Sequence, residues 1–232
     1  KYRFTNMSVS LPRVLECKLK TSLGWIAGTV GVKFTNLYSC HVVVGQVSKF
    51  ETNMLVYAID VGNVYNEYHI GHLYNGKINL LLDCNASGWT NENNFYGGRY
   101  SHESGEGANV SGVRHIKIAN VLNIINNNVF HKPSIEGNTP EYHVENGGSY
   151  NTFAYARWEA QPPKLLYYSD DNISIAANLA NKNLVIGGYD VDGIVVTNIG
   201  TKTKFNNRLI GHSRQLSSIS SSTGGYRYRN SS

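Results

Sequence analysis

The sequence predicts an all-β solenoid, a fold in which short strands wind through stacked coils, on three observations. An outline recurs along the middle of the chain: an asparagine, any residue, an aromatic residue, and an apolar residue five places beyond the aromatic. Short apolar segments alternate with polar turns, and no segment keeps a 3.6-residue periodicity over three turns. The chain also holds 28 asparagines against 21 Lys plus Arg, and asparagine is poor in helix interiors but tolerates tight turns.

The four copies of this outline are separated by 27, 35 and 23 residues, measured between their aromatics. A repeat of this length indicates a solenoid, and a solenoid made only of strands is a parallel β-helix. In such a coil the turn asparagines form ladders and the aromatic residues stack inside. We therefore predict four asparagine–aromatic pairs as structural rungs: Asn66 and Tyr68, Asn93 and Phe95, Asn128 and Phe130, and Asn151 and Phe153.

The elements follow in order along the chain. Residues 1–30 contain short alternating pieces, which we interpret as entry strands. Residues 31–160 form the predicted coils. The polar segment 101–109 lies in the longest interval, and we interpret it as an excursion from the coil. The strands predicted within the coils are 32–34, 41–44, 54–59, 78–83 and 116–121.

The C-terminal third has a different character. Gln161-Pro162-Pro163 interrupts the pattern, because proline cannot donate to a central ladder. Residues 161–216 are predicted to form closing coils or a small separate β-domain, and 217–232 an extended tail rich in Ser, Gly and Tyr. The chain has no initiator methionine and opens in mid-pattern, so we expect it to be a piece of a longer polypeptide.

Composition limits the partners. The net charge is +5, but the basic residues form no cluster, so we predict no nucleic-acid partner. No apolar run reaches the ~18 residues that a membrane span needs, and we predict no membrane insertion. The three cysteines, Cys17, Cys40 and Cys84, are odd in number and lack metal-binding spacing. We expect them to be small buried side chains, and we predict neither a metal nor a cofactor.

One stretch carries a resemblance to a known family. Gly88-Trp89 followed by Asn91-Glu92-Asn93-Asn94-Phe95-Tyr96-Gly97-Gly98-Arg99 resembles a stretch common in bacteriophage tailspikes of the pectate-lyase-like superfamily. The similarity covers residues 31–158. It implies a right-handed parallel β-helix; the smaller C-terminal β region is predicted from the strand-like pieces after residue 161 and not from this resemblance. It also implies a homotrimer on the virion that recognises bacterial surface polysaccharide, usually with cleavage. No catalytic signature of the family carries over residue by residue.

Strand alternation predicts two outward columns. If each aromatic points inward, the residues after it point outward, which gives His69, Tyr96, His131 and Ala154. Three places further on come His72, Arg99, Ser134 and Arg157. Such a strip suits a polysaccharide carrying carboxylate or phosphate, with tyrosine as a stacking face and arginine as a bidentate fork. A solvated outer face with incidental charge is the alternative. The predicted substrate-binding residues are His69, His72, Tyr96, Arg99, His131 and Arg157.

Glycoside hydrolysis requires two carboxyl groups. The candidates near the strip are Glu67, Glu92 and Glu159, and Glu67 and Glu92 are expected at nearly equivalent turn positions. Each is alternatively a solvated turn carboxylate. A β-eliminating lyase would instead use Tyr96 or His69 as the base with Arg99 as the charge neutraliser. The sequence does not separate hydrolase, lyase, non-catalytic binding module and structural trimer stalk. Further carboxylates considered are Asp83, Glu103 and Glu106.

Overall fold

The computed structural model describes residues 4–5, 8–10, 14–16, 25–103, 112–119, 125–137, 142–159, 164–168, 183–186, 188–190, 195–199, 208–210 and 218–221. All the regular elements of these residues are β-strands, so the predicted all-β class is confirmed. None of them belongs to a helix long and apolar enough to cross a membrane.

The strands form three sheets, and every described pairing is parallel. A four-stranded sheet contains β1 (Phe4–Thr5), β5 (Leu37–Tyr38), β8 (Gly62–Val64) and β11 (Trp89–Asn91). An eight-stranded sheet contains β4 (Val30–Thr35), β7 (Thr52–Ala58), β10 (Ile78–Cys84), β13 (Arg114–Ile118), β16 (Val144–Asn146), β19 (Lys164–Tyr168), β22 (Val195–Ile199) and β24 (Ser218–Ser221).

The third sheet has twelve strands and is called the long sheet below. Its main path is β2 (Ser8–Ser10), β6 (His41–Ser48), β9 (Glu67–Tyr74), β12 (Asn94–Ser101), β14 (Val129–His131), β17 (Thr152–Ala154), β20 (Leu184–Ile186) and β23 (Arg208–Ile210). Beside this path lie β3 (Val14–Glu16), β15 (Ser134–Glu136), β18 (Arg157–Glu159) and β21 (Tyr189–Asp190).

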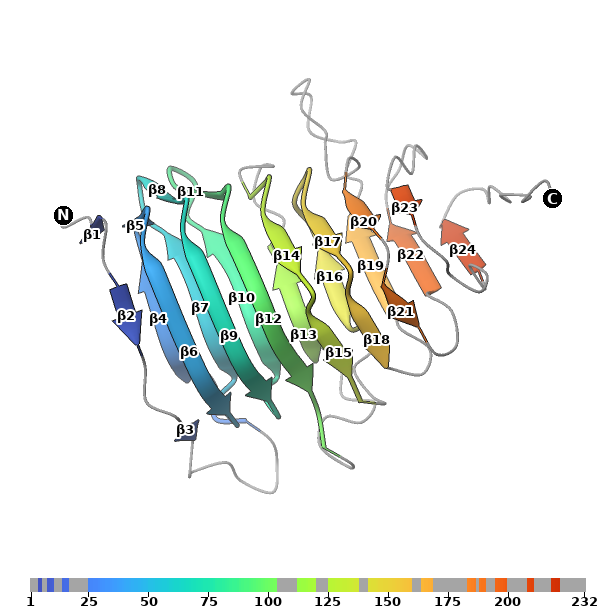
Figure 1. Ribbon diagram of the computed structural model, residues 1–232, viewed down its shortest axis with the longest axis horizontal. Helices are drawn as coiled ribbons and strands as arrows, with labels where there is room; N and C mark the ends of the chain where they lie inside the picture. The colour runs from blue at the N-terminus through green and yellow to red at the C-terminus, as the bar shows by residue number, and fades with distance from the viewer. Residues whose placement is uncertain are drawn as a thin grey trace.

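The chain visits these sheets in a fixed order. From β4 to β12 it passes three times through the eight-stranded, the four-stranded and then the long sheet. Each strand therefore pairs with its equivalent one circuit later, as β6, β9 and β12 do in Figure 1. The stacked parallel sheets are compatible with a parallel β-helix. Strands β19–β24 pair with the eight-stranded and long sheets in the same parallel sense.

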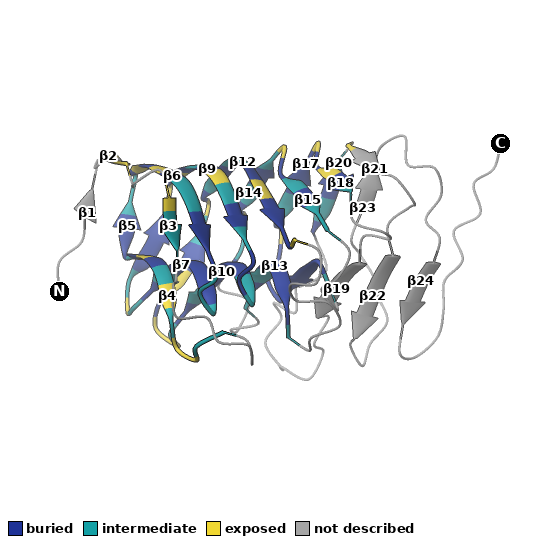
Figure 2. Cartoon of the chain, turned by 90° about the horizontal axis from the view of Figure 1, so that it is seen from below, coloured by how far each residue is buried: buried dark blue, intermediate teal, exposed yellow. Residues whose placement is uncertain are grey.

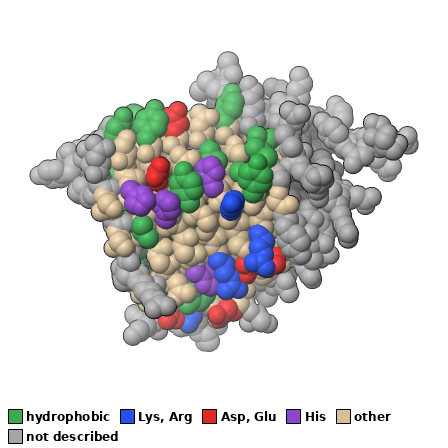
Figure 3. Space-filling model, viewed as in Figure 1, with side chains coloured by type: hydrophobic (Ala, Val, Ile, Leu, Met, Phe, Trp, Pro, Cys, Tyr) green, Lys and Arg blue, Asp and Glu red, His purple; other side chains and the backbone are tan. Residues whose placement is uncertain are grey.

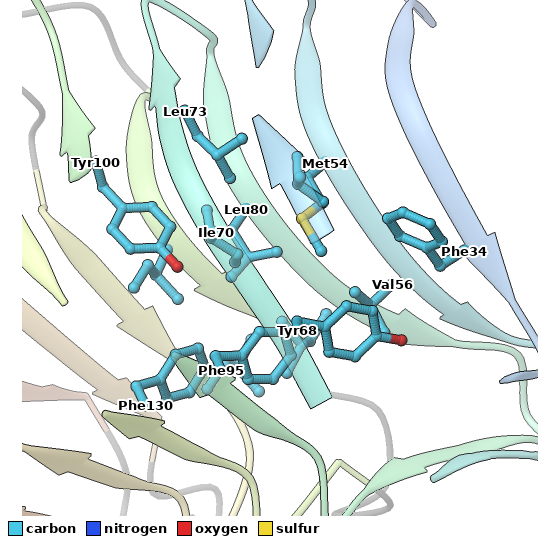
Figure 4. Close-up of a cluster of buried hydrophobic side chains, with 14 of the residues drawn as sticks. Phe34, Met54, Val56, Tyr68, Ile70, Leu73, Leu80, Phe95, Tyr100 and Phe130 are labelled. Carbon is cyan, nitrogen blue, oxygen red and sulfur yellow. The ribbon is translucent and has the colours of Figure 1, made fainter. Parts of the chain in front are cut away.

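The register confirms the aromatic rungs that the sequence predicts. Phe95 lies opposite Tyr68 on one side and Phe130 on the other, and Phe130 lies opposite Phe153. The rings stack at centroid distances of 4.9, 4.8 and 4.5 Å in that order. All four side chains are fully buried, and Figure 4 shows three of them in a row inside the coil.

The apolar residues five places beyond the aromatics also point inward. Leu73, Tyr100, Ile135 and Trp158 are in register and buried. They meet Met54, Leu80, Leu82 and Ile116 of the eight-stranded sheet in one hydrophobic cluster, and Figure 2 shows buried residues recurring on neighbouring strands along the stack. Burial of these side chains is the main favourable contribution to the fold.

The predicted asparagine ladder is present and continues one rung further than predicted. The side-chain oxygen of Asn93 accepts from the backbone N–H and the side-chain amide of Asn66, at 3.1 and 2.9 Å. The side-chain oxygen of Asn128 accepts the same two hydrogen bonds from Asn93, and that of Asn151 accepts them from Asn128. The oxygen of Asn183 accepts from the backbone N–H of Asn151. The ladder satisfies backbone groups that burial would otherwise leave without partners.

Each ladder asparagine from Asn66 to Asn151 follows a residue in the left-handed region. Tyr65, Glu92, Asn127 and Tyr150 have φ between 53° and 59°. The left-handed residue turns the chain just before the long sheet, and the asparagine then bonds across circuits. A non-glycine residue at positive φ is uncommon, so its repetition in four circuits marks this turn as a built feature of the coil.

Gly97 and Gly98 bend the long sheet in mid-strand. Both have positive φ, 67° and 86°, and a Cβ on Gly98 would lie 2.6 Å from the ring of Tyr100. In the next two circuits the same bend separates β14 from β15 and β17 from β18. Glycine is suited to this place because it has no Cβ and adopts positive φ readily.

Several other expectations fall at the limits of what the structure describes. The polar segment 101–109 begins with Ser101, which still belongs to β12, and residues 104–111 lie outside the described residues.

Of the three cysteines, Cys17 lies outside the described residues. Cys40 and Cys84 are both buried, and neither forms a disulfide within the described part of the chain. Burial raises the pKa of the Cys84 thiol to about 12, so this thiol stays protonated.

A second ladder changes from asparagine to histidine along the stack. Asn53, Asn79 and His115 are the second residues of β7, β10 and β13. Asn53 Nδ2 lies 2.8 Å from Asn79 Oδ1, and Asn79 Nδ2 lies 3.2 Å from His115 Nδ1. The ring of His115 contacts those of His102 and His143 at centroid distances of 4.8 and 5.3 Å. All three histidines are buried. Burial, and then the neighbouring His102 and His143, hold the pKa of His115 well below its ordinary 6.5.

This depressed pKa predicts a loss of stability in acid. Below about pH 6.5 the unfolded chain takes up a proton on His115 that the folded chain does not take up, so the free energy of unfolding falls as the pH drops. We expect His115→Asn to keep the fold, because its side-chain oxygen can replace Nδ1 beside Asn79, and to flatten this dependence. Urea titrations at pH 7 and pH 5 measure the free energy of unfolding at each pH. If the difference between the two values is the same in His115→Asn as in the unmodified chain, His115 is excluded as its source.

Candidate functional site

The outer face of the long sheet holds most of the predicted site residues. His69, Tyr96, His131 and Ala154 lie in register on β9, β12, β14 and β17, which confirms that the sequence repeat places them in one column. The ring of His69 stacks on Tyr96 at 4.8 Å, and Tyr96 stacks on His131 at 4.7 Å. Figure 3 shows histidine side chains gathered on this face.

The ring stack changes what Tyr96 can offer a ligand. Sequence reasoning expected its face to stack on a sugar, but both faces are covered by the imidazoles of His69 and His131. The three half-buried rings therefore present edges and polar atoms. Nε2 of His131 lies 3.1 Å from Oδ1 of Asn94, and partial burial lowers the pKa of His131. Ring edges of this kind suit hydrogen bonding to hydroxyl groups.

The second predicted column is also in register. His72, Arg99, Ser134 and Arg157 follow one another on β9, β12, β15 and β18. Arg99 Nε donates to Glu136 Oε2 at 2.7 Å, and Arg157 pairs with Glu159. Both guanidinium groups are thus engaged by carboxylates, whereas the sequence predicted open forks for an acidic polymer. His72 Nε2 lies 2.7 Å from Ser101 Oγ, and burial followed by the charge of Arg99 lowers the pKa of His72.

Glu136 is the functional candidate that sequence reasoning missed. Its carboxylate accepts from Ser134 Oγ at 2.6 Å and from Arg99, and lies 3.9 Å from Arg157 Nη1. Partial burial raises the pKa of this carboxyl, but the hydrogen bonds from Ser134 and Arg99 and the two arginine charges outweigh it. The pKa therefore lies below its ordinary value, and Glu136 is ionised at neutral pH.

Glu136 and Glu159 form a pair across two strands. They lie opposite each other on β15 and β18, which places their backbones about 4.8 Å apart, and both approach the guanidinium of Arg157. A sequence signal for this pair exists. Each glutamate directly follows the inward residue five places beyond its aromatic, Ile135 in one copy and Trp158 in the next.

Glu67 and Glu92 do not occupy equivalent positions, contrary to the sequence expectation. Glu67 follows the ladder residue Asn66 and lies in register with Asn94, whereas Glu92 precedes the ladder residue Asn93 in the left-handed turn. A hydrogen bond to Glu92 raises the pKa of the exposed Tyr65 hydroxyl, which places Glu92 beside the equivalent turn residue of the preceding circuit.

The remaining carboxylates are dispersed. Asp83 lies on β10 of the eight-stranded sheet, where burial raises its pKa. Glu103 lies beyond the end of β12, where its carboxylate and its backbone N–H are both hydrogen-bonded to the side chain of Asn75. Glu106 lies outside the described residues. The bend at Gly97 and Gly98 separates Tyr96, a candidate base for a lyase, from Arg99, the candidate charge neutraliser. Arg99 is also hydrogen-bonded to Glu136. Among the predicted catalytic glutamates, Glu159 is the one that the structure brings beside a second carboxylate.

Comparison with known proteins gives no relative for this chain: no family model, no curated protein and no solved structure matches it.

Proposed function

We propose that this chain forms coils of a right-handed parallel β-helix and that the outer face of its long sheet binds a polysaccharide of the bacterial surface. The tailspike resemblance of residues 88–99 supports this assignment, and with it a homotrimer on a phage virion. The observation that carries the proposal is the repetition of the same groups along the stack. Rings in one column and guanidinium–carboxylate pairs in the other recur over neighbouring strands.

This repetition suits a polymer. Neighbouring strands lie about 4.8 Å apart. The ring column therefore presents polar groups on three strands over about 10 Å, and the second column on four strands over about 14 Å. A chain of sugars offers hydroxyl groups repeatedly along its own length and can contact several strands at once. Because Arg99 and Arg157 are paired with carboxylates, the column supplies donors and acceptors side by side. We therefore favour a neutral polysaccharide over the acidic one that the sequence alone suggested.

Retention of purified neutral bacterial polysaccharides on the immobilised chain tests this binding. We expect Arg99→Ala and Glu136→Ala each to weaken retention by about 10- to 150-fold, because a lost charge-assisted hydrogen bond is worth about 1.5–3 kcal/mol. Lys33→Ala is the matched control, since Lys33 lies on the eight-stranded sheet over the ring of Tyr57. Equal retention by all variants would contradict the proposed face.

Cleavage is a second candidate function, favoured by the glutamate pair. Retaining glycosidases hold two carboxyl groups about 5–5.5 Å apart, a separation that side chains on adjacent strands can reach. In this proposal Glu136, whose pKa is lowered, is the ionised nucleophile and Glu159 is the proton donor. The carboxylate of Glu159 is already engaged by Arg157, which is why binding is the primary proposal.

The two functions differ in their products. If the chain cleaves, Glu136→Gln and Glu159→Gln should each lower the release of new reducing ends by at least about a hundredfold while the polymer is still bound. Mass analysis of the products then identifies hydrolysis, and an unsaturated product would indicate elimination instead. Retention of an unshortened polymer by the unmodified chain would assign binding alone.

A further inference from the structure

A cluster of three metal-ligand side chains lies on the outer face of β6 and β9. His41, Glu67 and His69 each offer a ligand atom, and these atoms all lie within 4.8 Å of one another. His41 Nδ1 is 3.5 Å from Glu67 Oε2, and the rings of His41 and His69 lie 4.7 Å apart. Two imidazoles and one carboxylate are a common ligand set for zinc with one open coordination position.

The backbone holds these three residues in a fixed relation. His41 lies directly opposite Glu67 in the β6–β9 register, and His69, two residues beyond Glu67 on the same strand, points to the same face. The two strands continue in parallel register on both sides of the cluster. Ligand placement thus needs no ordering of a loop, which lowers the entropy cost of binding a cation.

We propose that His41, Glu67 and His69 bind one divalent transition-metal ion of the zinc type. Tetrahedral zinc with bonds of about 2.0–2.1 Å holds its ligand atoms about 3.3 Å apart. The side chains must therefore close by rotation about their own bonds. His41 and Glu67 have room for this, because their side chains are 45% and 53% exposed.

The ring of His69 supplies a second, independent observation. Its Nε2 is shielded from solvent and has no hydrogen-bond partner. A shielded polar atom without a partner costs free energy, and a cation on the ring would give His69 the polar contact it lacks. Tyr96 stacks on the other side of this ring and fixes its plane.

The site is confined to β6 and β9. On the next strand the equivalent positions are Asn94 and Tyr96, and Asn94 Oδ1 already lies against His131. Neither residue is a good zinc ligand. The local sequence around His69 does not reveal this ligand set, because His41 comes from β6, one circuit earlier, and meets Glu67 only through the β6–β9 register.

Calorimetric titration of the full chain with Zn²⁺ at pH 7.5, with no polysaccharide present, tests the proposal. We expect one equivalent to bind, with the affinity lowered at least tenfold by His41→Ala, Glu67→Gln and His69→Ala taken singly. Glu67→Gln keeps the shape of an exposed side chain, so its effect cannot come from unfolding. Co²⁺ should give the visible absorption of a tetrahedral complex. Affinity should fall in acid, because protons compete with a metal ion for imidazole ligands.

His131→Asn is the matched control, because it removes a histidine from the same ring column without touching the cluster; its zinc affinity should be unchanged. The proposal is overturned if no zinc binds, or if the three cluster variants bind it as the unmodified chain does. Polysaccharide retention measured with a chelator is a separate readout, so a failed metal site leaves the proposed binding face untouched.

Discussion

Replacing Asn93 by alanine is expected to lower the free energy of unfolding by about 3 to 4 kcal/mol. The side chain of Asn93 bonds the backbone N–H and amide of Asn66, the carbonyl of Asn63 and the oxygen of Asn128. All of these groups are buried, and the loss of the side chain leaves several without a partner. Urea denaturation followed by circular dichroism measures the change.

The adjacent Asn94→Ala is its matched control. Asn94 lies on the outer face, and its side-chain oxygen contacts His131, so its loss should cost under about 1 kcal/mol. Equal losses in the two variants would mean that the ladder adds nothing beyond an ordinary surface hydrogen bond.

Phe95→Ala is expected to cost about 3 to 5 kcal/mol, the usual range for removing a fully buried aromatic side chain. Phe95 stacks between Tyr68 and Phe130 and is completely shielded from solvent. Its removal opens a cavity between two circuits that the hydrogen-bonded strands cannot close. The same urea titration applies, and the free energy of unfolding should fall without loss of cooperativity.

Tyr96→Ala on the same strand provides the comparison. Its ring is half-buried on the opposite face, so about half the transfer free energy of an aromatic side chain is at stake, about 1 kcal/mol. If Tyr96→Ala lowered the free energy of unfolding as much as Phe95→Ala does, the assignment of Phe95 to the inner face and Tyr96 to the outer face of β12 would be wrong.

The core of the long sheet was predictable because two periodicities coincide in the sequence. An asparagine two places before an aromatic sets the register between circuits, and alternation along each strand sets the face. Both signals agree at Asn93 and Phe95, and the structure places these residues accordingly. The outward columns follow from the same register, so the alignment of His69, Tyr96 and His131 was predictable too.

What the columns offer a ligand was not predictable. Register fixes which residues are neighbours, but ring stacking and ion pairing depend on side-chain rotation, and these cover the faces of Tyr96 and engage Arg99. Glu92 was misplaced because a shift of two residues across a left-handed turn moves a side chain to a different column. The partnership of His41 with Glu67 was not predictable either, because His41 lies in the circuit before the first copy of the repeat, where no copy of the outline sets the register.

Carbon-13 NMR of histidine rings tests most directly the claim that the outer face of the long sheet binds polysaccharide. The chain carries His69, His72 and His131 on this face and His102, His115 and His143 in the interior, so one spectrum contains both probe and control. On titration with a polysaccharide that the chain retains, we expect saturable shifts of the three outer rings and none of the interior rings. Binding that leaves all three outer resonances in place would contradict it.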